Sequence, residues 1–221
     1  MMKMFPIRLA AYVLSAAVSA AALPVSAAGA VGAAGASTDE LNAARQRIAH
    51  PEVLRGGFQQ EKRVAGFNNP LRSQGRFLLA RNKGVVWTTL KPFPSEMVVT
   101  RERILSVDGA GKRTVQADAS EQPALRQINA MMFALVDGDV STLASRFDLA
   151  AQTLPHDAWR LTLTPKDAAL TKIFARIELR GDRYVREVVM TETGGERTAL
   201  KFFDLSETPP RLSADEAQRF E

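Results

Sequence analysis

The chain has 221 residues, a formal net charge of +5 and no cysteine. A chain without cysteine forms no disulfides and offers no thiolate metal ligands. Its basic and acidic residues are interspersed, without an arginine or lysine stripe carrying interleaved aromatic residues, so the composition argues against nucleic-acid binding.

Residues 1–28 have the pattern of a secretory signal peptide. Lys3 and Arg8 supply the positive start, an Ala/Val/Leu core follows, and Val25-Ser26-Ala27 resembles a peptidase cleavage site. A membrane anchor is the rival interpretation, but Pro24 and several serines interrupt the apolar run. We therefore expect an exported protein whose leader is removed.

The rest of the chain is predicted to form one domain. Residues 29–36 are a Gly/Ala-rich stretch, which is typical of a flexible N-terminus. A lipid anchor needs a cysteine at the cleavage point, so we expect a soluble mature protein. Residues 37–221 are long enough to bury a substantial core as a single domain.

Periodicity predicts a strand-rich fold with few helices. Residues 39–49 and 140–144 are short helix candidates, and 122–136 is the strongest helix. Strand and turn patterns fill 54–115 and 146–205, and the latter contains two sequential hairpins. These blocks predict a curved antiparallel sheet whose concave side is covered by the strongest helix. The apolar stripe of that helix consists of Leu125, Ile128, Met131, Met132 and Leu135.

The methionine pair of this stripe has two interpretations. Methionines on an amphipathic helix usually pack into a core. Because methionine is flexible and polarizable, Met131 and Met132 also suit a pocket that accepts alkyl chains of varying length. In a half-barrel covered by this helix both interpretations predict the same location.

A second informative segment is the hairpin that follows residue 70. Alternation over 75–81 sends Phe77, Leu79 and Arg81 to one face of a strand, and 85–89 returns as the next strand. A guanidinium beside an apolar face is costly unless it is hydrogen-bonded. The alternative is an arginine at a strand end that extends to water with its stem on the sheet.

Candidate catalytic groups are sparse. His50 precedes a proline at a helix end and His156 lies in a turn-type segment, and neither has an obvious nucleophilic partner in sequence. Asp137-Gly138-Asp139 lacks the remaining ligands of a calcium loop. Asp108-Gly109-Ala110-Gly111 lacks the Lys-Ser/Thr pair of a phosphate loop. We predict a binding protein, not an enzyme, with no metal and no cofactor.

Several motifs resemble the LolA-type periplasmic carriers of lipoproteins. These are Phe58-Gln59-Gln60, the 75–81 strand, Trp87 five residues before Pro92, and more weakly the 161–165 segment. The resemblance implies an incomplete antiparallel barrel, covered by helices, whose apolar cavity holds acyl chains. It also implies that an arginine matching Arg81 holds the helical lid closed.

The sequence departs from that family in two places. Asn82 and Val85 stand where the family usually has a proline and a large aromatic residue. The chain also ends in a charged, helix-like tail over 213–221, with no further strand beyond Pro209-Pro210. Both departures suggest a divergent branch, for which a LolA-like carrier of an acyl or polyene glycolipid is the first alternative. A non-catalytic envelope sensor or interaction domain is the second.

The resemblance implies a set of lipid-binding and lid residues and a set of partners. The residues are Arg81, Phe77, Leu79, Val85, Trp87, Leu125, Ile128, Met131, Met132 and Leu135. The implied partners are an acylated lipoprotein or other acyl-lipid cargo, an inner-membrane transporter as donor and an outer-membrane receptor as acceptor. We expect a periplasmic monomer.

Overall fold

The computed structural model describes residues 38–107, 113–118 and 140–221. The chain divides into two units, Met1–Ala34 and Gly35–Glu221, and all described residues lie in the second unit. The predicted signal peptide, the 29–36 segment and the central 122–136 helix with its apolar stripe lie outside the described residues. Within the described ranges, no helix is both long enough and apolar enough to cross a membrane.

The described residues form eleven strands and three helices, most of them where the periodicity predicts. The predicted 39–49 helix is α1, and the short helical turn predicted from residue 140 is α3, which continues two residues further than expected. The helices are α1 (Thr38–Arg47), α3 (Val140–Arg146) and α4 (Ala214–Gln218). The strands are β1 (Val53–Arg63), β2 (Leu71–Ala80), β3 (Gly84–Lys91), β4 (Ser95–Val99), β5 (Arg103–Val107), β6 (Arg113–Asp118), β7 (Phe147–Thr153), β8 (Trp159–Pro165), β9 (Phe174–Gly181), β10 (Val185–Glu192) and β11 (Arg197–Ser206).

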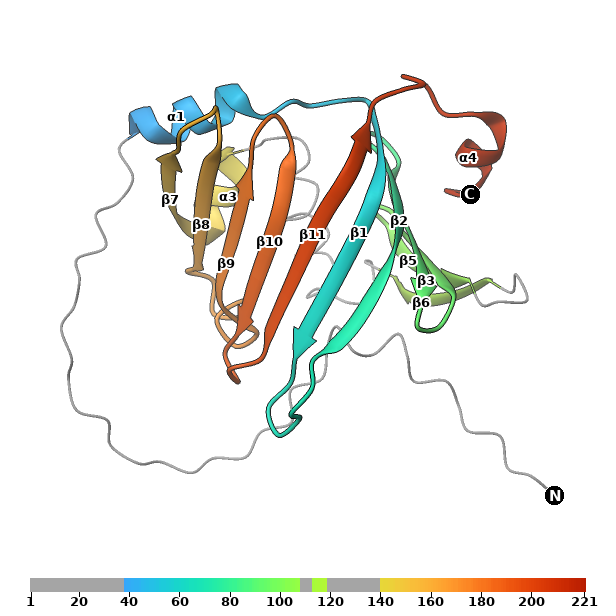
Figure 1. The fold of residues 1–221 in the computed structure, drawn as a ribbon, viewed down its shortest axis with the longest axis horizontal. Coiled ribbons are helices and arrows are strands. Elements are labelled where there is room, and N and C mark those ends of the chain that lie inside the picture. Colours follow the sequence, from blue (N-terminus) through green and yellow to red (C-terminus); the bar gives the residue numbers. More distant parts are fainter. Residues whose placement is uncertain (1–37, 108–112, 119–139) are drawn as a thin grey trace. The chain divides into compact units, whose positions relative to one another are not determined.

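All eleven strands belong to one antiparallel sheet (Figure 1). Its order is β6-β5-β4-β3-β2-β1-β11-β10-β9-β8-β7, so two sequential meanders are joined where the first strand pairs with the last. Among the described strands β6 and β7 form the two edges, which leaves the sheet open. The sheet curves away beyond β1 in Figure 1. The predicted mainly-β fold with an incomplete antiparallel barrel is confirmed.

The middle of the sheet has a bulge that contains two glycines. The register between β1 and β11 shifts between Arg55 and Gly57. A Cβ on Gly56 would lie 2.8 Å from the Phe77 ring, and a Cβ on Gly57 would lie 2.4 Å from the Phe203 ring. The two glycines therefore let aromatic rings approach the strand from opposite faces, and the bulge bends it.

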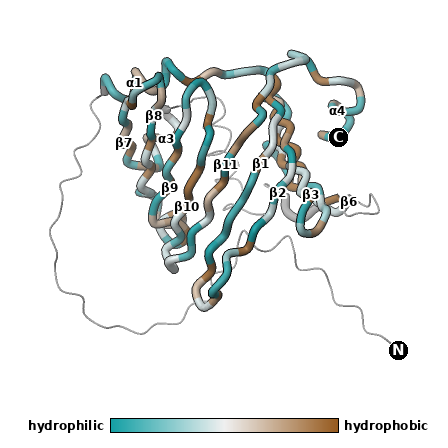
Figure 2. Tube along the Cα trace, viewed as in Figure 1, coloured by the Kyte–Doolittle hydropathy of each residue, from teal (hydrophilic) through white to brown (hydrophobic). Residues whose placement is uncertain are grey.

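The two faces of the sheet are packed by different parts of the chain. We call inner the face that carries Phe58, Phe77 and Leu163, and outer the opposite face, which carries Val86. Hydrophobic and hydrophilic residues alternate along the strands (Figure 2), as expected when the two faces meet different surroundings. The helices α1 and α3 contact β7.

The outer face of β2 to β5 is covered by the C-terminal tail. Phe220, which is 7% exposed, packs there against an apolar cluster, and Leu212 lies beside it. The helix α4 begins with a capping box, in which Ser213 accepts from the Glu216 amide while Glu216 accepts from the Ser213 amide. The predicted helix-like tail is thus confirmed. The cluster consists of Val53, Leu78, Ala80, Val86, Val98, Leu105 and Phe220.

Candidate binding face

Four aromatic side chains meet on the inner face in the middle of the sheet. Phe58 and Trp87 have ring centroids 3.9 Å apart, and Phe77 lies 6.3 Å from Trp87. Phe202 completes the group with edge-on contacts at 5.4 Å to Phe77 and 6.2 Å to Trp87. The strand register explains the meeting, because Phe58 pairs with Phe202 and Phe77 pairs with Trp87. We call these four residues the aromatic cluster.

Aliphatic residues extend the apolar inner face on both sides of the aromatic cluster. Toward β4, Leu79 pairs with Val85, which pairs with Val99. Toward β9, the rows contain Val188 opposite Leu179, and Met190 opposite Ile177. The middle rows of the inner face are therefore apolar from β4 to β8, which suits an elongated hydrocarbon better than a polar ligand.

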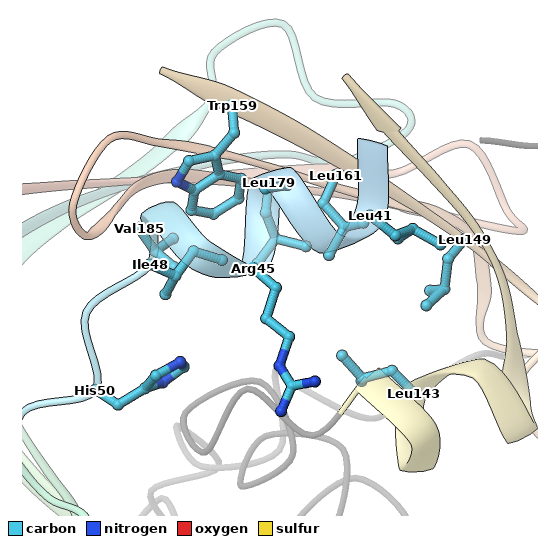
Figure 3. Close-up of a pocket in the computed structure, with 11 residues that line it drawn as sticks. Leu41, Arg45, Ile48, His50, Leu143, Leu149, Trp159, Leu161, Leu179 and Val185 are labelled. Atoms are coloured by element: carbon cyan, nitrogen blue, oxygen red, sulfur yellow. The ribbon is translucent and has the colours of Figure 1, made fainter. Parts of the chain in front are cut away.

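A small pocket lies between α1, α3 and the inner face (Figure 3). Its volume is about 40 Å³, well below the roughly 150 Å³ of a cavity that admits benzene. Arg45 and His50 lie on the side away from Trp159 and Leu161 in the close-up. An acyl chain would need α1 or α3 to move. The apolar lining comprises Leu41, Ala44, Ile48, Leu143, Leu149, Trp159, Leu161, Leu179 and Val185.

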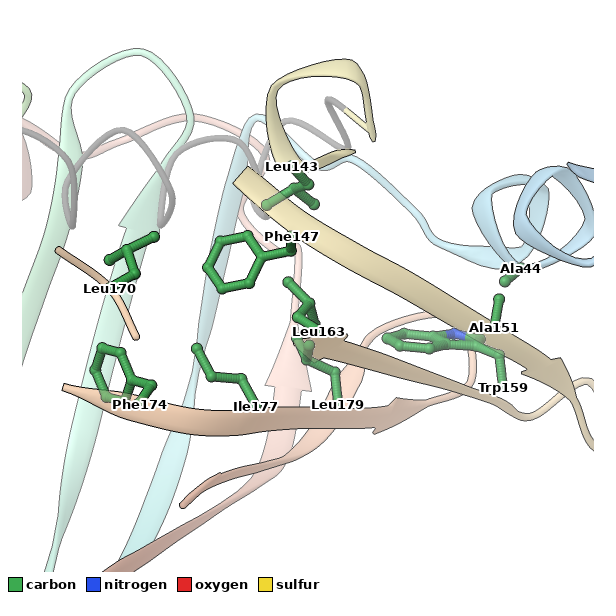
Figure 4. Close-up of a cluster of buried hydrophobic side chains, with 10 residues drawn as sticks. All are labelled: Ala44, Leu143, Phe147, Ala151, Trp159, Leu163, Leu170, Phe174, Ile177 and Leu179. Carbon is green, nitrogen blue, oxygen red and sulfur yellow. The ribbon is translucent and has the colours of Figure 1, made fainter. Parts of the chain in front are cut away.

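The base of this pocket belongs to the larger core cluster of the β7–β9 half (Figure 4). Ala44 from α1 and Leu143 from α3 pack there against buried strand residues such as Phe147, Leu163 and Ile177. These two helices thus cover one end of the apolar inner face, as lid helices would.

Hydrogen bonds fix the C-terminal end of α1. Arg47 donates to the carbonyl oxygens of Leu154 at 3.1 Å and Ala158 at 2.5 Å, and the Ala49 amide donates to the Arg183 carbonyl at 2.8 Å. Charged donors to carbonyl groups are among the stronger hydrogen bonds in proteins. The C-terminal end of α1 is therefore anchored to the β7–β8 turn and to the segment that links β9 and β10.

Arg81 directly follows β2, at the end of the hairpin that carries Phe77 and Leu79. Its amide donates to the Glu52 carbonyl at 3.0 Å, and its guanidinium lies 3.7 Å from the Glu52 carboxylate. The Arg81 side chain is 26% exposed, whereas the Glu52 side chain is 66% exposed. The Arg81 side chain as a whole is thus mostly covered, while this ion pair lies at the surface.

The opposite end of β1 carries a polar group on the inner face. The Lys62 ammonium lies 3.0 Å from the Glu192 carboxylate and 2.8 Å from the Glu196 carboxylate. Burial alone would lower the pKa of Lys62, but hydrogen bonds and charge from Glu196 and Glu192 raise it overall. Lys62 therefore stays cationic and ties β1 to the β10–β11 hairpin.

The structure brings together the four strand residues of the predicted site: Phe77 faces Trp87 and Leu79 faces Val85. Phe58 and Phe202 belong to the same group, but they were not among the predicted site residues. Phe58 stands in a motif of the first strand, whereas Phe202 gives no local signal because its place depends on the pairing of the first and last strands. The five helix residues of the predicted site lie outside the described part of the chain.

Of the histidines, His156 lies in the predicted turn with φ of 58°, and His50 lines the pocket. In the described part of the chain, no group of three or more His, Cys, Asp or Glu side chains could hold a metal ion.

Comparisons with solved structures find similar chains at low sequence identity. A LolA superfamily protein from Nitrosomonas europaea is 10% identical with a TM-score of 0.43, covering 84% of this chain and 97% of the other. A putative outer membrane lipoprotein-sorting protein domain from Vibrio parahaemolyticus is 11% identical with a TM-score of 0.41, covering 81% and 96%. The MucA/MucB complex of Pseudomonas aeruginosa contains a chain 19% identical with a TM-score of 0.42, covering 80% of this chain but only 61% of the other.

No curated protein sequence matches the chain. The family model described as outer membrane lipoprotein carrier protein LolA matches residues 50–216, which is well over half of the chain. The chain therefore belongs to the LolA family.

Proposed function

We propose that this protein is a periplasmic carrier that shelters the acyl chains of lipoproteins and takes them from the inner to the outer membrane. Membership of the LolA family supports a carrier or binding role. The observation that carries the proposal is the inner face, whose middle rows are apolar from β4 to β8 and have the aromatic cluster at their centre. The role involves no catalysis.

Binding and release are an exchange of contacts. Burying one methylene contributes about 0.8 kcal/mol, so a sheltered long acyl chain gains on the order of 10 kcal/mol before ordering costs. A carrier with only this term would not release its cargo. Contacts between the covering helices and the inner face compete with the cargo, which keeps the affinity moderate.

Arg81 is the proposed fastening residue of the closed empty state. Its side chain is mostly covered and lies at the end of the hairpin that contributes Phe77 and Trp87. A hydrogen bond from a charged group contributes roughly 1.5 to 3 kcal/mol. The planar fork of donors suits carbonyl oxygens of a lid segment better than an ammonium group does.

The proposed partners follow from the family. An inner-membrane transporter supplies the lipoprotein, and an outer-membrane receptor accepts it, with the signal peptide directing export to the periplasm. The protein acts as a monomer in this scheme.

A second candidate keeps the mechanism and changes the cargo to an acyl or polyene glycolipid. Val85 favours it, because this small side chain lies buried on the inner face where the family usually has a large aromatic residue. A narrower side chain leaves room for a differently shaped cargo next to the aromatic cluster.

Native mass spectrometry of protein purified from the periplasm tests the proposal. Bound lipid is expected, and its mass separates an acylated peptide from a glycolipid. An apolar fluorescent probe should also bind the protein in solution and be displaced by long-chain acyl lipids. A folded protein that binds neither probe nor lipid would favour a sensor or interaction domain.

A further inference from the structure

Large hydrophobic side chains are exposed at two neighbouring hairpin tips. Phe67 is 68% exposed in the β1–β2 turn and Phe93 is 64% exposed in the β3–β4 turn. Leu71 and Leu90, at the adjoining strand ends, are 48% and 45% exposed. Singly scattered exposed hydrophobic residues are normal on proteins. Here four of the five large exposed hydrophobic side chains in the described part of the chain lie at the same end of the sheet. We call these four residues the hairpin patch.

The sheet topology places both tips at the same end of adjacent strands. Lys62 pairs with Leu71 across β1 and β2, and Gln74 pairs with Lys91 across β2 and β3. The β1–β2 turn and the β3–β4 turn therefore lie at the same end of the sheet, and the β1–β2 hairpin extends further because β2 continues three residues beyond Gln74. Figure 1 shows the β1–β2 hairpin at one extremity of the sheet.

Basic side chains flank the β1–β2 turn of the hairpin patch. Arg63 and Arg72 have side chains that are 68% and 75% exposed, and both contact Glu61, at 3.3 and 3.2 Å. One carboxylate thus faces two guanidinium groups. Five cations and four anions at the ends of β1 to β4 and of the β10–β11 hairpin leave a net charge of +1. They are Lys62, Arg63, Arg72, Lys91 and Arg197 against Glu61, Glu96, Glu192 and Glu196.

The inner face begins at this patch. Leu71, Gly75 and Phe77 all lie on the inner side of β2, since side chains two residues apart in a strand share a face. Six residues from Leu71 to Phe77 span roughly 20 Å at about 3.3 Å per residue. An acyl chain that enters at the hairpin patch therefore reaches the aromatic cluster along β2, on a path that runs beside the Lys62 ion pairs.

We propose that the hairpin patch is a membrane-docking surface that inserts Phe67 and Phe93 into the interface of an anionic lipid bilayer. Aromatic rings at the depth of the headgroups, flanked by arginine and lysine, are the combination that such an interface accepts. The cations meet anionic headgroups while the rings bury apolar area. This proposal rests on the proposed carrier function and adds the membrane itself as a partner.

Vesicle flotation of the purified protein tests the docking surface. The probes are vesicles of phosphatidylcholine alone and vesicles containing about one-third phosphatidylglycerol. The wild-type protein should float with the anionic vesicles more than with the neutral ones, and less as salt is added. The double variant Phe67→Ser/Phe93→Ser should bind at least about tenfold more weakly.

Two matched controls isolate the patch. Phe203→Ser removes the one other large exposed hydrophobic side chain of the described residues, on β11, and should leave vesicle binding unchanged. Arg72→Gln should weaken binding to anionic vesicles about fivefold. Arg211→Gln removes the same charge from an exposed position of the tail and should have little effect.

The outcomes separate the docking surface from the carrier role. A double variant that loses vesicle binding but keeps its fold and its affinity for an apolar probe in solution supports docking. A wild-type protein that floats with neither vesicle, or a double variant that floats like wild type, overturns it. Absence of probe binding by the wild-type protein would count against the carrier role and would leave a positive flotation result standing.

Discussion

The C-terminal tail gives the sharpest quantitative expectation, in the variant Glu216→Gln. The Arg55 guanidinium donates to both carboxylate oxygens of Glu216, each at 2.7 Å, and also to the carbonyls of Pro209 at 2.7 Å and Arg211 at 3.1 Å. Glutamine keeps the shape of Glu216 and can still accept from the Ser213 amide in the capping box. The substitution therefore removes the charge and leaves the cap in place.

The size of the effect follows from the pKa of Glu216. The hydrogen bond from the Arg55 guanidinium is the largest cause that lowers this pKa from 4.5 to about 2, and the hydrogen bond from the Ser213 amide also lowers it. That difference corresponds to at most about 3 kcal/mol. Both side chains are about one-fifth exposed, so solvent screening reduces the expected contribution to about 1 to 2 kcal/mol.

The sign of the pH dependence is fixed by the same pKa. A carboxylate whose pKa is lowered on folding stabilises the protein above its unfolded pKa of about 4.5. This stabilisation is lost as the pH falls toward 2, and less than about half of it remains at pH 3. The difference in unfolding free energy between wild type and Glu216→Gln should shrink accordingly.

Urea unfolding at about pH 7, 5 and 3 provides the assay. Fluorescence of Trp87 and Trp159 reports on both halves of the sheet, since these strands lie on opposite sides of β1. Asp215→Asn removes a neighbouring carboxylate of α4 and is the matched control, with an expected change within about 0.5 kcal/mol. Equal stability of Glu216→Gln and wild type at neutral pH, or a loss that does not shrink in acid, would refute the reasoning.

Three further expectations concern the inner face and its fastening. A Cβ on Gly75 would lie 1.9 Å from the Thr88 carbonyl oxygen, so Gly75→Ala should cost more than about 3 kcal/mol in urea unfolding. Gly194→Ala, where a Cβ meets nothing within 4 Å, is its control, and similar losses in both would contradict the packing argument. Phe58 is fully buried, so Phe58→Ala should lower the free energy of unfolding by about 3 to 5 kcal/mol. This variant should also bind an apolar probe more weakly, and unchanged probe affinity would count against the aromatic cluster as a binding site. Arg81→Leu should slow lipid release to acceptor vesicles in stopped-flow transfer, with Arg81→Lys in between, and equal release rates would contradict the fastening role.

Local patterns were sufficient to predict most of the strands. Gly84, for example, marks the turn between β2 and β3 in the sequence. It begins β3 with φ of 142°, a backbone conformation in which a side chain would be strained. Alternation then correctly predicted that Phe77 and Leu79 share a face, because the strand period is two. Each of these signals lies within about ten residues of sequence.

Features that depend on distant pairing could not be read in this way. Phe202 joins the aromatic cluster only because β11 pairs with β1, and residues that far apart carry no shared local pattern. Leu78 and Ala80 are apolar on the face opposite Phe77, which alternation alone does not explain. The tail supplies the reason, since Phe220 covers them on the outer face.

The anchoring of α1 bears on how a cargo could displace the cover. Leu41 and Ala44 contact the inner-face core, and Arg47 and Ala49 are hydrogen-bonded at the other end of the helix. Full burial of a leucine contributes about 1.5 to 3 kcal/mol, which two to four methylenes of an acyl chain replace at about 0.8 kcal/mol each. Displacing Arg47 as well would add two charged hydrogen bonds of roughly 1.5 to 3 kcal/mol each. An acyl chain therefore exchanges most favourably with the Leu41 end while the Arg47 end stays fixed, so α1 would pivot and remain in place to close again after release.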